Sequence, residues 1–290
     1  MLIQLSFLCY KIRSVFVQQS GSVCEFSNSD SWVILSPIEQ SIKRKIESVG
    51  TPLKDWDINI YRGVLTGYNE AFIISTEKRD EILANCQTED ERARTAELIR
   101  PILRGRDIKR YGYNWANLWL INTHNGIRGK LERVHIEDYP AIKAHLDQYW
   151  DRISKRADKG DTPYNLRNCA YLDLFFQPHI CWKAVGRKLA FALVEAGTFL
   201  TAPASFISAG RYNKTVLAFL CSTIGTYFVY KNSDTTGAGD IMLNIQSLIK
   251  FPIPKIDIDF DDFSDREIDL YIYDIYKFTK EEIHYIEEQV

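Results

Sequence analysis

The stretch Leu98-Ile-Arg-Pro-Ile-Leu-Arg-Gly-Arg-Asp-Ile-Lys-Arg-Tyr-Gly-Tyr113 gathers cations and aromatic rings on a backbone that cannot form one long helix. Pro101, Gly105 and Gly112 interrupt helical hydrogen bonding and favour turns. The charged and aromatic side chains are Arg100, Arg104, Arg106, Lys109, Arg110, Tyr111 and Tyr113. Cations neutralise phosphates, Arg contacts guanine edges and rings stack on bases, so this composition suits a nucleic-acid surface. A solvated charged loop is the other interpretation.

The charge along the 290 residues is uneven, although the net charge is only −2. Residues 98–190 contain 17 Lys and Arg against nine Asp and Glu, whereas residues 255–290 contain four against 12. A basic middle followed by an acidic tail indicates one surface that faces a polyanion. A hydrophobic content of 46% and this length allow one large core or two modest ones.

The cysteine and histidine patterns predict no metal centre and no nucleophilic triad. The six cysteines lack C-x-x-C spacing, and the five histidines are scattered. The cysteines therefore indicate reduced thiols in a cytoplasmic protein. No window approaches the roughly 20 apolar residues of a membrane span, and the first residues lack the features of a signal peptide.

The periodicity predicts an α+β fold with mixed or antiparallel sheets flanked by helices and closed by a C-terminal helix. Ser36, Pro37 and Glu39 mark the start of the first strong helix, which Gly50 ends. We expect further helices over 77–85, 88–99, 138–157, 212–230 and 265–288. We expect strands over 1–35, within 56–76, and over 115–122, 179–185, 189–195 and 204–209.

Two short motifs could indicate an enzyme. Asp161-Thr162-Pro163-Tyr164 differs by one residue from the Asp/Asn-Pro-Pro-Tyr signature of amino-methyltransferases, but it follows a predicted helix instead of a strand. Gly237-Ala238-Gly239-Asp240 could hold a phosphate, yet it lacks a third glycine and a preceding strand. An exposed loop and a turn are the interpretations that we favour.

Three basic clusters therefore carry the main functional signal, each with a nearby ring. They are residues 100–110 with Tyr111, residues 152–167 with Tyr164, and residues 183–188 with Trp182. Their density predicts a groove that binds a polyanion.

Four segments also resemble a known family, the TaqI-like C-terminal specificity domain of adenine-N6 DNA methyltransferases and type IIG restriction enzymes. The first runs from Thr51-Pro52-Leu53 to Phe72-Ile73-Ile74 and contains Arg62-Gly63-Val64-Leu65-Thr66-Gly67-Tyr68-Asn69. The second is Ile99 to Tyr111, the third is Lys155 to Arg167, and the fourth is Phe251-Pro252-Ile253-Pro254. The resemblance covers residues 32–256 in order.

The resemblance implies a target-recognition domain over 32–256, a seam with a missing catalytic domain over 1–31, and an acidic linker and helix over 257–290. It implies double-stranded DNA and a methyltransferase or nuclease domain or subunit as partners, with no membrane. S-adenosylmethionine and Mg are expected only in that missing part, so we expect no cofactor, no metal and no catalysis in this chain. The parent could methylate, cleave, or do both.

The predicted DNA contacts are Arg100, Arg104, Arg106, Lys109, Arg110, Tyr111, Arg156, Lys159, Tyr164, Arg167, Lys183, Arg187 and Lys188. Base contacts are expected in the loops at 122–133 or 184–188. The predicted structural residues are Gly63, Thr66, Gly67, Asn69, Phe72, Gly105, Asp107, Pro252 and Pro254, with Asp107 holding a neighbouring Arg. Two alternatives stay open: an interaction subunit that docks through its acidic C-terminal helix, and a degenerate methyltransferase.

Overall fold

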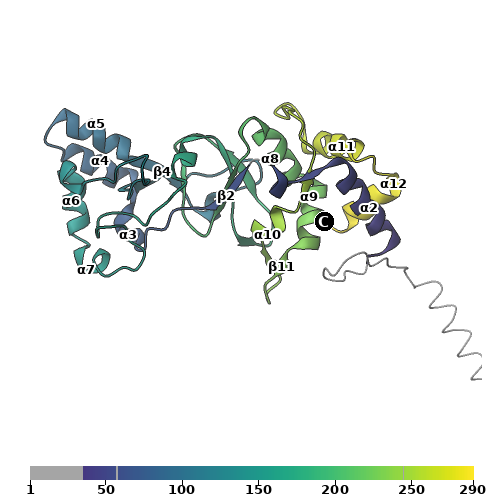
Figure 1. Cartoon of the computed structure of the whole chain (residues 1–290), viewed down its shortest axis with the longest axis horizontal. Helices are drawn as coiled ribbons and strands as arrows, with labels where there is room; N and C mark the ends of the chain where they lie inside the picture. Colours follow the sequence, from purple (N-terminus) through teal and green to yellow (C-terminus); the bar gives the residue numbers. More distant parts are fainter. Residues whose placement is uncertain (1–34, 57, 244) are drawn as a thin grey trace, which may run out of the picture.

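A computed structural model describes residues 35–56, 58–243 and 245–290. The predicted strands and seam within residues 1–31 lie outside these described residues. The molecule is elongated, with helices at both ends and strands between them (Figure 1). It has the predicted α+β composition, with antiparallel and mixed sheets and helices at the C-terminus, so the predicted fold class is confirmed.

A central antiparallel sheet separates two hydrophobic cores. Its four strands follow the order β2 (Asn59–Arg62), β10 (Ser205–Ser208), β6 (His179–Trp182) and β8 (Phe191–Val194). Successive side chains of a strand point to opposite faces. Phe206 and Cys181 are cross-strand neighbours in the first core, whereas Ile207 and Ile180 belong to the second. Both faces are covered, which explains why all four residues of β6 are buried.

The first lobe, which contains the first core, is built on a mixed sheet. Its strands follow the order β3 (Ile73–Ser75), β5 (Leu118–Ile121), β4 (Ile99–Leu103) and β9 (Phe199–Leu200), and only β4 and β9 run parallel. The helices of this lobe lie at one end of the molecule (Figure 1). They are α3 (Asn69–Phe72), α4 (Thr76–Ala84), α5 (Glu89–Leu98), α6 (Pro140–Asp147) and α7 (Trp150–Ile153).

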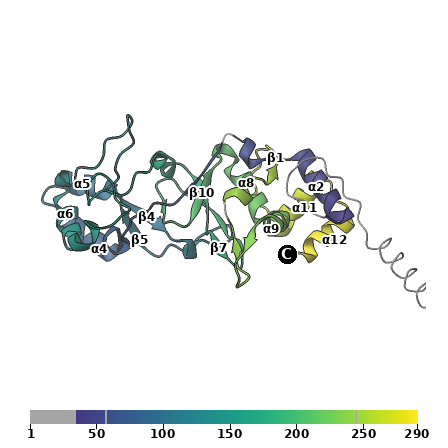
Figure 2. The same cartoon turned by 60° about the horizontal axis from the view of Figure 1, so that its bottom comes forward.

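The second lobe, which contains the second core, is mostly helical. Its helices are α2 (Pro37–Val49), α8 (Asn213–Cys221), α9 (Thr223–Asn232), α10 (Ile245–Leu248), α11 (Asp265–Ile275) and α12 (Lys280–Glu288). A two-stranded sheet joins β1 (Thr51–Pro52) to β13 (Pro252–Ile253). A three-stranded sheet in the order β11 (Asp234–Thr235), β12 (Ile241–Met242) and β7 (Val185–Gly186) lies beside these helices. It is visible at the lower edge of Figure 2.

The helix starts agree with the predicted capping signals. The Ser36 hydroxyl accepts a hydrogen bond from the Glu39 amide at 3.4 Å, and the Glu39 carboxylate accepts one from the Ser36 amide at 2.9 Å. This capping box and Pro37 begin α2, and Gly50 ends it, as predicted. The predicted helices over 77–85 and 88–99 correspond to α4 and α5.

Three helices that the periodicity predicts as continuous are each divided in two. The 212–230 segment breaks at Ser222, whose hydroxyl caps α9 by accepting from the Gly225 amide. The 265–288 segment breaks where Lys277 takes a φ of 55° and Thr279 starts a new capping box. The 138–157 segment divides into α6 and α7, and Trp150 is exposed instead of buried. In the first two segments, local capping therefore overrides a continuous apolar stripe.

Two further segments differ from the sequence prediction. The segment 56–76 was expected to be strand, tight turn and strand, but β2 and β3 belong to different sheets with α3 between them. The stretch 98–113, for which the sequence suggests a bent nucleic-acid surface or a solvated loop, begins with a strand, β4, in which Ile102 and Leu103 are fully buried. Apolar residues between the cations place this strand inside its sheet.

Candidate nucleic-acid interface

The stretch 98–113 crosses from the first lobe to the second. Its strand β4 and Ile108 lie in the first core, whereas Tyr111 packs against the second. The Tyr111 amide donates to the Phe191 carbonyl at 2.8 Å, which fixes the stretch to the central sheet. Tyr111 has a φ of 62° and its hydroxyl is buried without a partner. Burial raises the pKa of Tyr111. Its ring therefore has a structural role, and its contact with DNA stays a prediction.

Two of the predicted contact arginines hold the protein itself together. The Arg104 guanidinium donates to both carboxylate oxygens of Asp107, at 2.9 and 2.8 Å. Arg110 donates to the Cys221 carbonyl and pairs with Asp265, so it ties the stretch to α8 and α11. Both arginines thus have an internal structural role, and contact between either of them and DNA stays a prediction.

The ion pair of Arg104 and Asp107 also shows in the pKa values. The hydrogen bond to Asp107 is the main reason why the pKa of Arg104 is raised. Burial by itself would raise the pKa of Asp107, but hydrogen bonds from the side chain and backbone of Arg104 lower it overall. Asp107 thus holds a neighbouring Arg, as the sequence predicted.

Arg100 lies in β4 with its guanidinium 5.1 Å from the centre of the Phe176 ring. Its Nε is buried without a hydrogen-bond partner among the described residues. A guanidinium stacked on a ring in this half-buried position is better placed to pack than to reach a phosphate.

The remaining cations of the stretch meet the third basic cluster. A Cβ atom at Gly105 would lie 3.3 Å from Cβ of Lys183, so the two segments touch. This contact, not a positive φ, is the constraint on Gly105. Five side chains define a basic patch here: Arg106, Lys109, Lys183, Arg187 and Lys188.

Most of the basic patch is unneutralised. Within the described chain, Arg106, Lys109 and Lys188 are exposed and make no ion pair with a carboxylate. Arg187 is exposed and lies 3.6 Å from a carboxylate oxygen of Asp240. Segments about 75 residues apart thus form one cationic surface, which can bind phosphates without first breaking strong internal ion pairs.

The middle basic cluster has a different role. Arg156 is only 7% exposed and donates to the carbonyls of Thr66, Asp158, Pro163 and Asn165. Burial lowers the pKa of Arg156 to about 10, so it remains charged at neutral pH. Its donors are used inside the protein, which corrects the predicted DNA contact.

The other members of this cluster are partly exposed. Lys159 donates to the Ser154 carbonyl at 2.9 Å, and Arg167 pairs with Asp158 at 2.7 Å. The Tyr164 hydroxyl donates to the Asp147 carboxylate at 2.6 Å. Contact between DNA and Lys159, Tyr164 or Arg167 stays a prediction.

The predicted structural residues lie where backbones approach closely. A Cβ atom at Gly63 would lie 2.4 Å from the Leu200 carbonyl, and Gly67 has a φ of 68°. The Thr66 hydroxyl donates to Asn69 Oδ1 at 2.5 Å, at the start of α3. The fully buried Phe72 ends that helix. The sequence spacing from Gly63 to Phe72 therefore specifies this turn.

The closing motif, Phe251 to Pro254, contacts both the strand β1 and the C-terminal helices of the second lobe. Pro252 pairs with Pro52, and its carbonyl accepts a hydrogen bond from the Tyr276 hydroxyl at 2.7 Å. Pro254 is buried beside it. The predicted structural role of both prolines agrees with this geometry.

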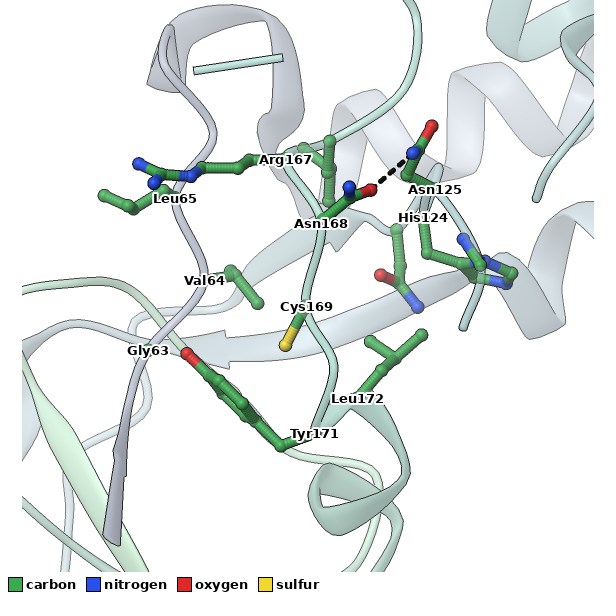
Figure 3. Close-up of a pocket in the computed structure, with 13 residues that line it drawn as sticks. Gly63, Val64, Leu65, His124, Asn125, Arg167, Asn168, Cys169, Tyr171 and Leu172 are labelled. Carbon is green, nitrogen blue, oxygen red and sulfur yellow. Dashed lines mark hydrogen bonds between the residues drawn. The ribbon is translucent and has the colours of Figure 1, made fainter. Parts of the chain in front are cut away.

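A small pocket of about 40 Å³, lined by both polar and apolar side chains, lies between the turn at 63–65 and the loops at 122–126 and 166–172 (Figure 3). Asn125 and Asn168 are hydrogen-bonded to each other at its rim. Asn122, predicted only as the first residue of a loop that contacts bases, lines the pocket and is 3% exposed, and its Oδ1 has no partner among the described residues. The volume admits two or three water molecules. In the sequence Asn122 only follows an ordinary apolar strand, and this pattern does not indicate that its side chain lines a pocket.

The two enzyme-like motifs form loops. Thr162 donates to Asn165 Oδ1 at 2.6 Å, and Asp161 accepts from Asn125 at 3.0 Å. The glycines 237 and 239 lie in the turn between β11 and β12, as the favoured interpretation predicts. Among the described residues, no cluster of three or more His, Cys, Asp or Glu could hold a metal ion. No helix in this part of the chain could span a membrane.

Comparison with known proteins now gives this geometry a context. A model of the TaqI-like C-terminal specificity domain matches residues 100–253, more than half of the chain. No curated protein matches. The type IIL restriction-modification enzyme MmeI, solved in complex with DNA, is similar with a TM-score of 0.51 and 12% identity, over 82% of this chain and 36% of MmeI.

The type IIG restriction endonuclease BpuSI gives a TM-score of 0.48 and 17% identity, over 83% of this chain and 27% of that protein. This chain thus spans about a third of MmeI and about a quarter of BpuSI. The likeness to MmeI is one of overall fold.

Proposed function

The chain belongs to the family of TaqI-like C-terminal specificity domains, and from this membership we propose that it recognises double-stranded DNA through the basic patch. The observation that carries the proposal is the meeting of Arg106 and Lys109 with Lys183 and Lys188 on one exposed surface. Arg187 completes this surface. These five cations contact phosphates and fix the position and register of the domain on the duplex.

A catalytic domain or subunit then acts on the DNA that this domain positions. The chain covers 36% of MmeI, which leaves room in such proteins for further domains. We propose that S-adenosylmethionine and Mg bind to that catalytic part, which methylates or cleaves the target. The proposed boundaries are 32–256 for the recognition domain and 257–290 for the C-terminal segment.

Packing of the C-terminal helices argues against the alternative of an interaction subunit. Ile268, Ile272 and Tyr276 are buried in the second core, so the apolar face of α11 is already used inside the chain. The acidic residues that remain outside would repel DNA and orient the basic patch toward it. The C-terminal segment therefore supports recognition without being its contact surface.

Fluorescence anisotropy with a random-sequence duplex tests the proposal. The triple variant Arg106→Ala/Lys109→Ala/Lys188→Ala removes three patch cations. The matched control Arg44→Ala/Lys54→Ala/Lys280→Ala removes three exposed cations from α2, the turn after β1 and α12. Both variants lose the same net charge, so only position distinguishes them.

The patch variant should bind at least about tenfold more weakly at low salt. The slope of log affinity against log salt concentration should become less negative by about 2 to 3, because each phosphate contact contributes about −0.9 to that slope. The control should stay within about twofold of the wild type. Equal weakening of both variants, or no wild-type binding at about 50 mM salt, would overturn the proposal.

A further inference from the structure

The three-stranded sheet of β7, β12 and β11, with the turn at 236–240, forms a ribbon beside the basic patch. Both views show the end that carries β11 extending away from the body of the molecule (Figures 1 and 2). Lys183, Arg187 and Lys188 of the patch lie on the chain that enters and leaves β7. The ribbon is thus continuous in sequence with the surface proposed to hold phosphates.

The two faces of the ribbon differ. Gly186, Ile241 and Thr235 are cross-strand neighbours, and Ile241 is buried in the second core, so this row faces inward. The next row is Val185, Met242 and Asp234, which therefore faces outward. Val185 is 47% exposed and Met242 is 42% exposed. Two large apolar side chains thus lie side by side in solvent, beside an exposed carboxylate.

The tip of the ribbon is held in one shape. The Thr236 amide donates to the Asp240 carbonyl at 2.7 Å, and the Gly239 amide donates to the Thr236 carbonyl at 2.9 Å. Gly239 has a φ of 79°, which a side chain would strain. At Gly237 and Gly239 a Cβ atom would meet nothing within 4 Å among the described residues, so their packing does not fill this space.

We propose that the outward row of the ribbon enters the major groove of the target DNA and contacts base edges there. This inference rests on the proposed function and names its specificity element. The major groove is about 12 Å wide and admits a two-stranded β-ribbon such as the β11–β12 hairpin. The flanking cations supply the charge complementarity that seats a ribbon between two phosphate backbones.

The chemistry of the row matches base edges. Val185 and Met242 present apolar surface to the 5-methyl group of thymine, and the Asp234 carboxylate accepts a hydrogen bond from the N4 amine of cytosine. Arg187, beside this row, is 82% exposed, and although its Nε lies 3.6 Å from Asp240, its terminal nitrogens can donate to guanine. An acid that faces DNA is unfavourable unless it meets a donor, and cytosine supplies one.

Selection of bound sequences from a random duplex library tests this, with the full chain and three single variants. Asp234→Asn and Met242→Ala change the outward row at exposed positions, so folding should be intact. Leu270→Ala is the matched control, because Leu270 is also an exposed apolar residue and lies on α11, outside the basic patch and outside both loops predicted to contact bases. Anisotropy on a non-cognate duplex measures general affinity in parallel.

The wild type should enrich a consensus, and each ribbon variant should change relative affinity about fivefold or more at one or two adjacent base pairs. Non-cognate affinity should stay within about twofold, and Leu270→Ala should keep the wild-type consensus. An unchanged consensus in both ribbon variants overturns the inference, as does a wild type that binds DNA without preference. A wild type that fails to bind any duplex instead overturns the proposed function on which the inference rests.

Discussion

The guanidinium of Arg156 lies over the ring of Phe72, with 4.3 Å between its central carbon and the ring centre. The same guanidinium donates to four backbone carbonyls from two loops that are separated by about 90 residues. The ring covers one face of the cation while the carbonyls surround its edge. Arg156 therefore fixes the turn at 66–67 against the loop at 158–165.

Replacing this arginine should destabilise the domain severely. Arg156→Met keeps much of the apolar stem but removes a donor from four carbonyls, of which that of Asn165 still accepts from the Gly160 amide. Each buried group left unsatisfied costs about 1–3 kcal/mol. We expect a loss of about 3 kcal/mol or more in the free energy of unfolding, measured by urea denaturation. The exposed neighbour provides the control, because Lys155→Met should change stability by less than about 0.5 kcal/mol. Similar values for the two variants would contradict the structural role.

Sequence reasoning located this loop but mistook the function of its arginine. The spacing of Arg156, Asp158 and Arg167 looks like an exposed basic run, and Lys159 and Arg167 are indeed exposed. Whether an arginine points outward or inward depends on carbonyls brought from Thr66, far away in the chain. No local pattern in the sequence predicts that the Thr66 carbonyl lies beside Arg156. The positive φ of Gly67, which follows Thr66, is easier to anticipate because glycine favours that conformation.

Substitutions of two neighbouring arginines in the stretch 98–113 should have different effects, one on the stability of the fold and the other on DNA affinity. Arg104→Ala removes the partner of the buried Asp107 and should lower the midpoint of urea unfolding clearly. Arg106→Ala removes an exposed cation and should leave that midpoint unchanged while weakening duplex binding severalfold. Urea titration and anisotropy on the same two proteins measure this. If Arg104→Ala weakened only DNA binding and Arg106→Ala lowered only the unfolding midpoint, the roles assigned to the two residues would be wrong.

The C-terminal segment should behave as part of the second core. Ile272 is fully buried and Leu270, two residues earlier on the same helix α11, is 49% exposed. Ile272→Ala should cost about 2–5 kcal/mol of unfolding free energy because it leaves a cavity, whereas Leu270→Ala should cost less than about 1 kcal/mol. If both changes were nearly neutral, residues 264–290 would form a separate appendage, as the predicted boundary at 257 implies.

The two-lobed architecture shows why only part of the fold follows from sequence. The apolar runs at 179–182 and 191–194 predicted strands correctly, because both faces of β6 and β8 are buried. Those runs cannot reveal which strands pair, since β2 and β10 join from positions more than 140 residues apart. The meeting of Gly105 with Lys183, and hence the basic patch, depends on that pairing. The basic clusters could therefore be predicted from the sequence, but their meeting in one basic patch could not.

Buried histidines should make the domain less stable in mild acid. His145 is 5% exposed; its Nε2 donates to the Ala71 carbonyl at 3.0 Å, and its Nδ1 is buried without a partner. Burial is the main cause that lowers the pKa of His145, and it also lowers the pKa values of His124 and His179. Below the unfolded value of about 6.5, the unfolded chain thus binds more protons than the folded protein, so stability falls as pH falls.

Urea midpoints at about pH 7.5 and pH 5.5 measure this dependence. We expect a lower midpoint at pH 5.5 for the wild type and a smaller difference for His145→Gln, since the glutamine amide can still donate to the Ala71 carbonyl but cannot be protonated. His135→Gln is the control because that side chain is exposed, and it should keep the wild-type difference. A midpoint that rises on acidification, or a His145→Gln variant as pH-sensitive as the wild type, would show that other groups control acid stability.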